Sequence, residues 1–276
     1  MAKTYQEVLS WASSFLEEQG KEGYAIQYVF LARKHWTKTD WLLNMRKEIS
    51  FAEEQQLQSD LAALLANHPP QYLIGYEEFY GRRFHVTTDT LIPRPETEEL
   101  VALCLEKNSS EPLTVVDVGT GTGAIAITLK AERPNWQVMA VDISVAALEI
   151  AQKNSQALTT EVDFYLGDTL EPISQPIDVL ISNPPYISQS EWSLMDESVR
   201  LFEPKTALFA SNNGLAMYEK LAQQAKMKLQ PHGKIFLEIG FQQGEAVKKL
   251  FQEVFPNKVI EIKKDLAGQE RMIFVY

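Results

Sequence analysis

The chain is predicted to fold as an α/β protein, with a Rossmann-like, doubly wound sheet whose last strand is antiparallel, preceded by a small helical bundle. Three observations predict this: helical spacing of apolar residues in the N-terminal region, alternating strand and helix patterns after Pro93, and a glycine-rich turn after the first strand of that region. We expect a helical domain at 1–75, a β-hairpin linker at 76–92 and a catalytic domain at 93–276.

The sequence pattern of the N-terminal region predicts amphipathic helices. Between Tyr5 and Ala66 apolar residues recur three and four positions apart, and the stretch NHPP at 67–70 ends the last run. Residues 76–92 then place aromatic and β-branched residues on both sides of Gly81, which is typical of a β-hairpin.

The region after Pro93 alternates between strands and helices. Strands are expected at 113–118, 137–143, 162–168, 177–183, 234–240, 258–264 and 271–276, and helices at 96–107, 124–132, 145–154, 215–229 and 244–255, with a long irregular segment up to Gly214. Ser144 is expected to cap the helix that follows it. The turn at Ala267 and Gly268 is too short for a crossover helix, so the last two strands should be antiparallel.

Composition narrows the class of protein. The net charge of -11 disfavours non-specific attraction to nucleic acid phosphates and favours a small-molecule or protein substrate. Cys104 is the single cysteine and the four histidines lack ligand spacing, so we expect neither a disulfide nor a metal site. Because no segment has the apolar length of a signal peptide or a membrane span, we expect a soluble cytoplasmic protein.

The stretch DVGTGTGA at 117–124 indicates a ligand site. It is expected at the carboxyl end of the first sheet strand, where open α/β sheets bind their ligands. Gly119 and Gly121 permit a tight turn and a close approach of backbone to ligand, and Gly123 permits close packing of helix on strand. The pattern fits both a nicotinamide dinucleotide site and a nucleoside-binding methyltransferase site.

Three carboxylates accompany this loop. Asp142 ends the second strand, where an acid can bind a ribose, and Asp168 ends the third, where it could accept from an adenine amine or simply be a polar strand end. Asp117 precedes the glycines, and a carboxylate there suits a cationic sulfonium ligand that carries an ammonium group better than a pyrophosphate. This last feature favours the methyltransferase.

The stretch ISNPPYI at 181–187 follows the fourth strand, across the switch point of the sheet from the glycine loop. Prolines donate no backbone hydrogen bonds, so the side-chain oxygen of Asn183 and the carbonyl oxygen of Pro184 are left as neighbouring acceptors. Such a pair suits a planar NH2 group, either an amide or the exocyclic amine of a base. Tyr186 offers a ring face against which a flat group can pack.

Several stretches taken together resemble one known family. NPPY alone is shared by S-adenosylmethionine-dependent methyltransferases that modify planar amino groups, those of DNA and RNA included. With QYLIGYEEFYGRRF, LIPRPETEEL, VRLFEPKTALFA, LEIGFQQGEAV and DLAGQERMI, the chain resembles the HemK/PrmC family, the glutamine methyltransferases of peptide chain release factors. The resemblance runs from about residue 70 to the C-terminus, and the helical region has the length and position of that family's substrate-recognition domain.

The resemblance implies a class I S-adenosylmethionine-dependent methyltransferase. Its methyl acceptor would be the side-chain amide nitrogen N5 of the glutamine in the Gly-Gly-Gln motif of class 1 release factors, which modulates translation termination, and S-adenosylhomocysteine would be the product. No metal, direct nucleic acid binding or membrane is implied. The cofactor-binding positions would be Gly119, Thr120, Gly121, Thr122, Gly123, Asp142, Asp168 and Asn183, and the catalytic positions Asn183, Pro184, Pro185 and Tyr186. Many relatives carry an aromatic residue where this chain has Thr169.

Other readings of the sequence stay open. A nucleic acid amino-methyltransferase would meet the same NH2 geometry, but the net charge of -11 disfavours it. A nicotinamide dehydrogenase leaves NPPY unexplained, and a non-catalytic binding module predicts a damaged loop or a missing asparagine. Arg94 and Glu96 could line the cofactor cleft. Glu96 could instead stabilise a helix N-terminus. Glu203 could cover the active site or only anchor its own loop.

Overall fold

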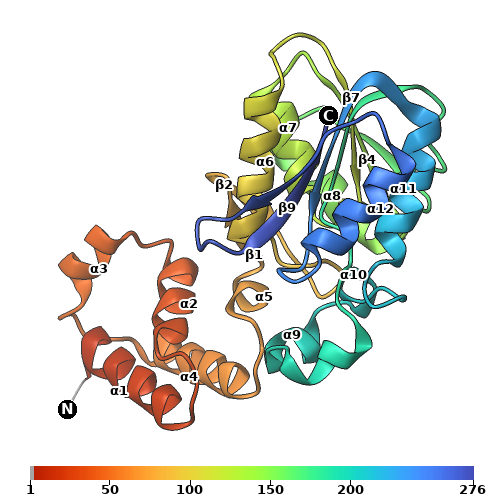
Figure 1. Cartoon of the computed structure of the whole chain (residues 1–276). Helices are drawn as coiled ribbons and strands as arrows, with labels where there is room; N and C mark the ends of the chain where they lie inside the picture. Colours follow the sequence, from red (N-terminus) through yellow and green to blue (C-terminus); the bar gives the residue numbers. More distant parts are fainter. Residues whose placement is uncertain (1–2) are drawn as a thin grey trace. The chain divides into compact units, whose positions relative to one another are not determined.

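The computed structural model describes residues 3–276, which form two compact units (Figure 1). One unit comprises the chain up to Tyr76 together with Asp196–Phe202, and the other comprises Glu77–Met195 and Glu203–Tyr276. A short stretch from the second half of the sequence is thus part of the N-terminal unit. No sequence pattern indicated this, because six helical residues are too few to show a periodicity.

The N-terminal unit is a set of helices around one apolar core, to which α1, α2 and α4 contribute. Its helices are α1 (Tyr5–Glu18), α2 (Tyr24–Lys34), α3 (Lys38–Asn44), α4 (Phe51–Leu65), α5 (Pro70–Ile74) and α9 (Glu197–Phe202). Helices α1, α3 and α4 begin with capping boxes at Thr4, Thr37 and Ser50. In each one, the hydroxyl accepts from the backbone N–H three residues further on, and the carboxylate of that residue accepts from the N–H of the capping residue. The ring of Phe202 in α9 lies 4.0 Å from that of His68.

A seven-stranded sheet forms the centre of the larger unit, in the order β5-β4-β3-β6-β7-β9-β8. The strands are β3 (Thr114–Val118), β4 (Gln137–Asp142), β5 (Asp163–Leu166), β6 (Ile177–Ser182), β7 (Leu229–Glu238), β8 (Ile260–Lys264) and β9 (Glu270–Val275). Strands β3 to β7 are parallel, and β9 is antiparallel to β7 and β8, which confirms the predicted reversal. The strand order reverses between β3 and β6, where sheets of this kind bind ligands.

Helices cover both faces of this sheet (Figure 1). On one face lie α6 (Pro95–Lys107) and α7 (Ala124–Glu132), with α8 (Val145–Ala157) beside α7; on the other lie α11 (Ala216–Lys228) and α12 (Gly244–Val254). Because successive strand residues point to opposite faces, Val115 packs with α6 and α7 while Val116 packs with α11 and α12. Burial on both faces explains why β3, β4 and β6 carry consecutive apolar residues instead of a strict alternation of apolar and polar ones.

The remaining elements are short. The expected hairpin is present as β1 (Tyr76–Phe79) and β2 (Arg82–His85), and the hydroxyl of Ser144 caps α8 by accepting from the N–H of Ala147. The prediction of one irregular segment up to Gly214 is wrong, because that segment contains η1 (Gln189–Leu194), α9 and α10 (Lys205–Leu208). Within residues 3–276, no helix combines the length and the apolarity that a membrane crossing requires.

Candidate active site

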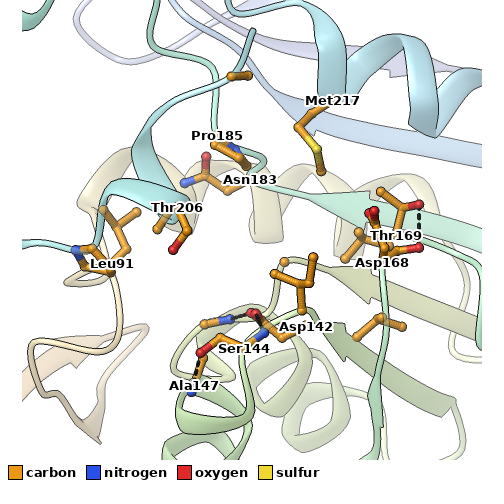
Figure 2. A pocket seen from close by; sticks show the side chains of 18 of the residues that line it. Leu91, Asp142, Ser144, Ala147, Asp168, Thr169, Asn183, Pro185, Thr206 and Met217 are labelled. Atoms are coloured by element: carbon orange, nitrogen blue, oxygen red, sulfur yellow. Dashed lines mark hydrogen bonds between the residues drawn. The ribbon is translucent and has the colours of Figure 1, made fainter. Parts of the chain in front are cut away.

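A cavity of about 380 Å³ lies at the carboxyl ends of the parallel strands (Figure 2). Small-molecule sites occupy about 300 to 1,000 Å³, so the cavity has the size of a ligand site. Five of the residues that line it lie at strand ends or within three residues after them, namely Gly119, Gly121, Asp142, Asp168 and Asn183. The rest of the lining includes Leu91 before α6, Pro185 and Thr206 after β6, and Met217 in α11.

Five other positions that the family resemblance assigned do not line this cavity. Thr120 and Thr122 border a neighbouring hollow of about 50 Å³, which Asn183 also borders. Gly123, Pro184 and Tyr186 border neither space. The structure therefore brings together about half of the assigned residues around one cavity, and the other five do not line it.

The glycine loop presents bare backbone to the cavity. Gly121 has a φ of 54°, and a Cβ added there would meet no atom within 4 Å, so the space beside it is open. Its N–H donates to Oδ2 of Asp142 at 2.9 Å, and the N–H groups of Gly119 and Thr120 donate to the carbonyl of Val141. These bonds hold the loop against β4 and leave room for a ligand at its surface.

Gly123 serves packing instead. It is the N-cap of α7 with a φ of 81°, and an added Cβ would lie 2.7 Å from Cδ1 of Ile127 and 3.2 Å from Cβ of Ala151.

We expect Gly123→Ala to lower the free energy of unfolding by about 2 to 5 kcal/mol, the sum of a left-handed backbone penalty and overpacking. Denaturant unfolding measures this. Gly121→Ala, which adds its Cβ to open space, is the control and should lose only the backbone penalty of about 1 to 2 kcal/mol; equal losses would contradict the packing role.

Asp142 is oriented by backbone donors and keeps acceptor capacity. Its Oδ1 accepts from the N–H of Ser144 and its Oδ2 from that of Gly121, both at 2.9 Å. Each carboxylate oxygen has two lone pairs, so each can accept a further hydrogen bond from a ligand. Burial raises the pKa of Asp142, and the backbone donors oppose this. A fixed carboxylate with two free acceptor sites suits a pair of ribose hydroxyls.

Asp168 lines the cavity, but its carboxylate also forms an ion pair with Lys220 of α11, which raises the pKa of the lysine. An adenine amine at this position would therefore meet a carboxylate that is already partly neutralised. Thr169 follows with a φ of 55°, a strained conformation for a β-branched residue, and its Oγ1 lies 2.7 Å from Oε1 of Gln224. A small, tethered side chain thus borders the cavity here (Figure 2).

Asp117 is fully buried and does not border the cavity. Its Oδ2 accepts from the hydroxyl of Thr120 at 2.7 Å and from the N–H of Ala126 at 3.3 Å. Burial raises the pKa of Asp117 to about 7. Asp117 therefore ties the glycine loop to the first turns of α7.

Asn183 stands where β6 ends and borders both hollows. Its Nδ2 donates to Oγ1 of Thr97 at 3.1 Å, so the amide is held by one edge. The Tyr186 hydroxyl donates to Oε1 of Glu238 at 3.4 Å, and the Tyr186 carbonyl accepts from Nε2 of Gln243 at 2.9 Å. Tyr186 therefore fastens the loop after Asn183, and burial raises the pKa of its hydroxyl.

An ion pair anchors the two segments that cover the cavity. Oε1 of Glu203 accepts from Nη2 of Arg94 at 2.5 Å, and its Oε2 accepts from the N–H of Ile92 at 3.2 Å. The Glu203 side chain is 1% exposed, so it is an anchor of its loop and not a group that faces a ligand. Arg94 borders the smaller hollow, and Glu96 lies in the first turn of α6.

Sequence reasoning missed the apolar side chains of the cavity. Ile143 borders it and is 65% exposed, and Leu91 and Met217 border it from distant parts of the chain. An apolar residue directly after a strand-end acid was a usable signal for Ile143. Leu91 and Met217 gave no such signal, because only the tertiary fold brings them to the site.

Comparisons with known proteins identify both parts of the chain. The model of the PrmC N-terminal domain matches residues 7–75, and that of the methyltransferase small domain matches residues 96–213. A release factor glutamine methyltransferase of Enterococcus faecalis is 60% identical, with 99% of each chain covered, and one of Lactococcus lactis is 43% identical, with 92% of this chain and 94% of its own length covered.

Solved structures bear on the fold alone. A methyltransferase from Pyrococcus furiosus is similar with a TM-score of 0.55 at 17% identity, over 79% of this chain and 97% of that chain. Together with the sheet order, this identifies the class I methyltransferase fold, for which S-adenosylmethionine is the methyl donor. At 60% identity over its whole length to a named member, the chain belongs to the HemK/PrmC family of release factor glutamine methyltransferases.

Proposed function

We propose that this protein methylates N5 of the glutamine in the Gly-Gly-Gln motif of class 1 peptide chain release factors, in the cytoplasm, and that this modulates translation termination. Its family makes it an S-adenosylmethionine-dependent protein-glutamine methyltransferase that acts on release factors. The observation that carries the finer proposal is the Asn183 amide, which is held at one edge beside the cavity while its other edge is left for a planar NH2 group.

We assign cofactor binding chiefly to the glycine loop at 119–123 and to Asp142 and Asp168, with a minor contact from Asn183. S-adenosylmethionine supplies a methyl group on a positively charged sulfur and leaves as S-adenosylhomocysteine. The open space at Gly121 and the two free acceptor sites of Asp142 support the assignment, since they suit a bulky ligand and its ribose. Exposed Ile143 adds an apolar surface for a base.

We assign the positioning of the substrate amide to Asn183, which lines the cavity, and to the backbone carbonyl of Pro184, which follows it but does not itself line the cavity. An amide nitrogen is a poor nucleophile because its lone pair is delocalised, so the site has to align it with the methyl group and exclude water. Alignment of this kind supplies up to roughly 7 to 11 kcal/mol in favourable cases. Acceptors at Asn183 Oδ1 and the Pro184 carbonyl also stabilise the positive charge that develops on the nitrogen. No base is required before attack, because the methylated nitrogen is strongly acidic and loses its proton afterwards.

We assign recognition of the release factor to the N-terminal helical unit. Its α3 has no buried residue, and Trp11, Leu43 and Phe51 are large apolar side chains that are more than half exposed. Exposed apolar groups of this size are typical of surfaces that contact another protein.

The test offers a purified release factor and unmodified DNA side by side to the protein with radiolabelled S-adenosylmethionine. We expect label on the release factor alone. A release factor whose Gly-Gly-Gln glutamine is replaced by alanine is the matched control and should stay unlabelled. Label on the DNA would overturn the proposal in favour of a nucleic acid amino-methyltransferase.

A further inference from the structure

A buried chain of hydrogen bonds leads from Asn183 into the sheet. Asn183 Nδ2 donates to Thr97 Oγ1 at 3.1 Å, and Thr97 Oγ1 donates to Glu238 Oε2 at 2.6 Å. Thr97 and Glu238 are 5% and 2% exposed, so water cannot readily replace either residue as a hydrogen-bond partner. Neither residue has a role in the assignments made above.

The fold brings these three residues together from distant parts of the chain. Thr97 lies in the first turn of α6, and Glu238 is the last residue of β7. Ser182 of β6 pairs with Leu237 of β7, so the residues that follow them, Asn183 and Glu238, emerge side by side at the same edge of the sheet.

The direction of the bonds decides which edge of the Asn183 amide faces the cavity. An ionised carboxylate only accepts, so the single hydroxyl proton of Thr97 goes to Glu238. Oγ1 of Thr97 then has only lone pairs to offer, and Asn183 has to present its NH2 edge to it. The amide oxygen therefore lies on the free edge, where it can accept from a substrate NH2.

Loss of the carboxylate would remove this order. Without an acceptor at Glu238, the Thr97 hydroxyl can turn and donate to the amide oxygen of Asn183. The amide would then present its own NH2 edge to the substrate, and two donors would face each other. A hydrogen bond would be replaced by a repulsive contact at the reacting nitrogen.

We propose that Thr97 and Glu238 are positioning residues that hold Asn183 with its oxygen toward the substrate amide, a role that rests on the proposed function. Neither residue touches the reacting atoms. They act through Asn183, by making one of its two amide orientations the stable one; Glu238 also accepts from the Tyr186 hydroxyl in the loop that follows Asn183.

The surroundings of Glu238 make this arrangement sensitive to pH. Burial raises the pKa of Glu238 to about 7 from an ordinary 4.5; Thr97, Arg271 of β9 and the Tyr186 hydroxyl oppose the shift, and Glu96 of α6 adds to it. Tyr218 of α11 donates to the backbone carbonyl of Glu238 at 2.9 Å. The pKa of Glu238 is higher in the folded state than in the unfolded state, so the folded state gains stability as pH is lowered from above 7 toward 4.5. Protonation of Glu238 over the same range weakens the hydrogen bond that it accepts from Thr97. Stability and turnover should therefore change in opposite directions.

The test measures single-turnover methyl transfer to a release factor at saturating S-adenosylmethionine in five variants. Glu238→Met keeps the side-chain length but removes the hydrogen-bond acceptor. We expect its rate to fall about 100-fold, which is the usual effect of removing one preorganised polar contact from an active site. Thr97→Val removes the hydroxyl and leaves the amide free to adopt either orientation, for which we expect a loss of only about 10-fold. The double variant should recover to the level of Thr97→Val, because the misdirected hydroxyl is gone.

Thr128→Val is the matched control. Thr128 is buried in α7, and its hydroxyl has no hydrogen-bond partner within the described chain, so the same chemical change there should not alter the rate. Thr97→Ser keeps the hydroxyl and should regain most of the rate that Thr97→Val loses. The wild-type rate should decline as pH is lowered through about 7, and Thr97→Val should lack that decline.

The outcomes separate this inference from the proposed function. A wild-type protein that does not methylate the release factor would contradict the function itself. If the wild type is active but the double variant loses the product of the two single losses, Thr97 and Glu238 support the fold independently and the positioning role is wrong. Unfolding curves for each variant show whether any loss of rate follows a loss of stability.

Discussion

Asn183→Ala is expected to lower the rate of methyl transfer by roughly 100- to 1,000-fold, the usual loss when a preorganised polar group is removed from a developing charge. The reason is positional as well as electrostatic, since Oδ1 of Asn183 is the side-chain acceptor that we assign to the substrate amide. Single-turnover kinetics with a release factor measure the loss. Affinity for S-adenosylmethionine should stay within about threefold of wild type, because the alanine leaves the glycine loop and Asp142 in place.

The cofactor titration decides how this variant is interpreted. If Asn183→Ala loses S-adenosylmethionine binding in the same proportion as turnover, Asn183 is mainly a cofactor contact and the role given to it here is wrong. Substrate affinity provides a second check, because an interaction made chiefly in the transition state lowers kcat more than it raises KM.

Asp142→Ala is expected to weaken S-adenosylmethionine binding by about 2 to 4 kcal/mol, or roughly 30- to 1,000-fold, because hydrogen bonds to a charged acceptor contribute about 1.5 to 3 kcal/mol each. The substitution also removes the acceptor for the N–H of Gly121, so the glycine loop loses its tie to β4. Calorimetric titration of the purified protein with S-adenosylmethionine measures the change directly.

Asp163→Ala is the control for this experiment. Asp163 begins β5, is exposed and does not border the cavity, and its loss changes the net charge by the same amount. It should bind S-adenosylmethionine as the wild type does. Equal weakening in both variants would mean that general electrostatic attraction, and not the oriented carboxylate at the end of β4, determines the affinity.

Much of the fold follows from local sequence patterns. The central strands β3, β4 and β6 are mostly apolar, and α7 and α8 begin where Gly123 and Ser144 indicate. The antiparallel end followed from the shortness of the turn around Gly268. The helices of four to six residues between β6 and α11 were not predicted, because one turn of helix leaves no periodic signal in the sequence.

The candidate site was predictable only where residues lie at strand ends or just after them. Asp142 and Asn183 could be placed because the carboxyl ends of neighbouring parallel strands share one edge of a sheet. Thr97 and Glu238 could not, because their importance lies in a hydrogen bond between residues 141 positions apart. The burial of Asp117 and its hydrogen bonds with Thr120 and Ala126 could not be predicted either, because they exist only once the glycine loop is folded.

The most direct test of the account is to map the modified residue on a release factor after reaction with S-adenosylmethionine, by peptide mass spectrometry. The account predicts a mass increase of one methylene unit on the glutamine of the Gly-Gly-Gln motif, with none in a parallel reaction with Asn183→Ala. A methyl group on any other residue, or an unmodified release factor in the presence of bound S-adenosylmethionine, would contradict it.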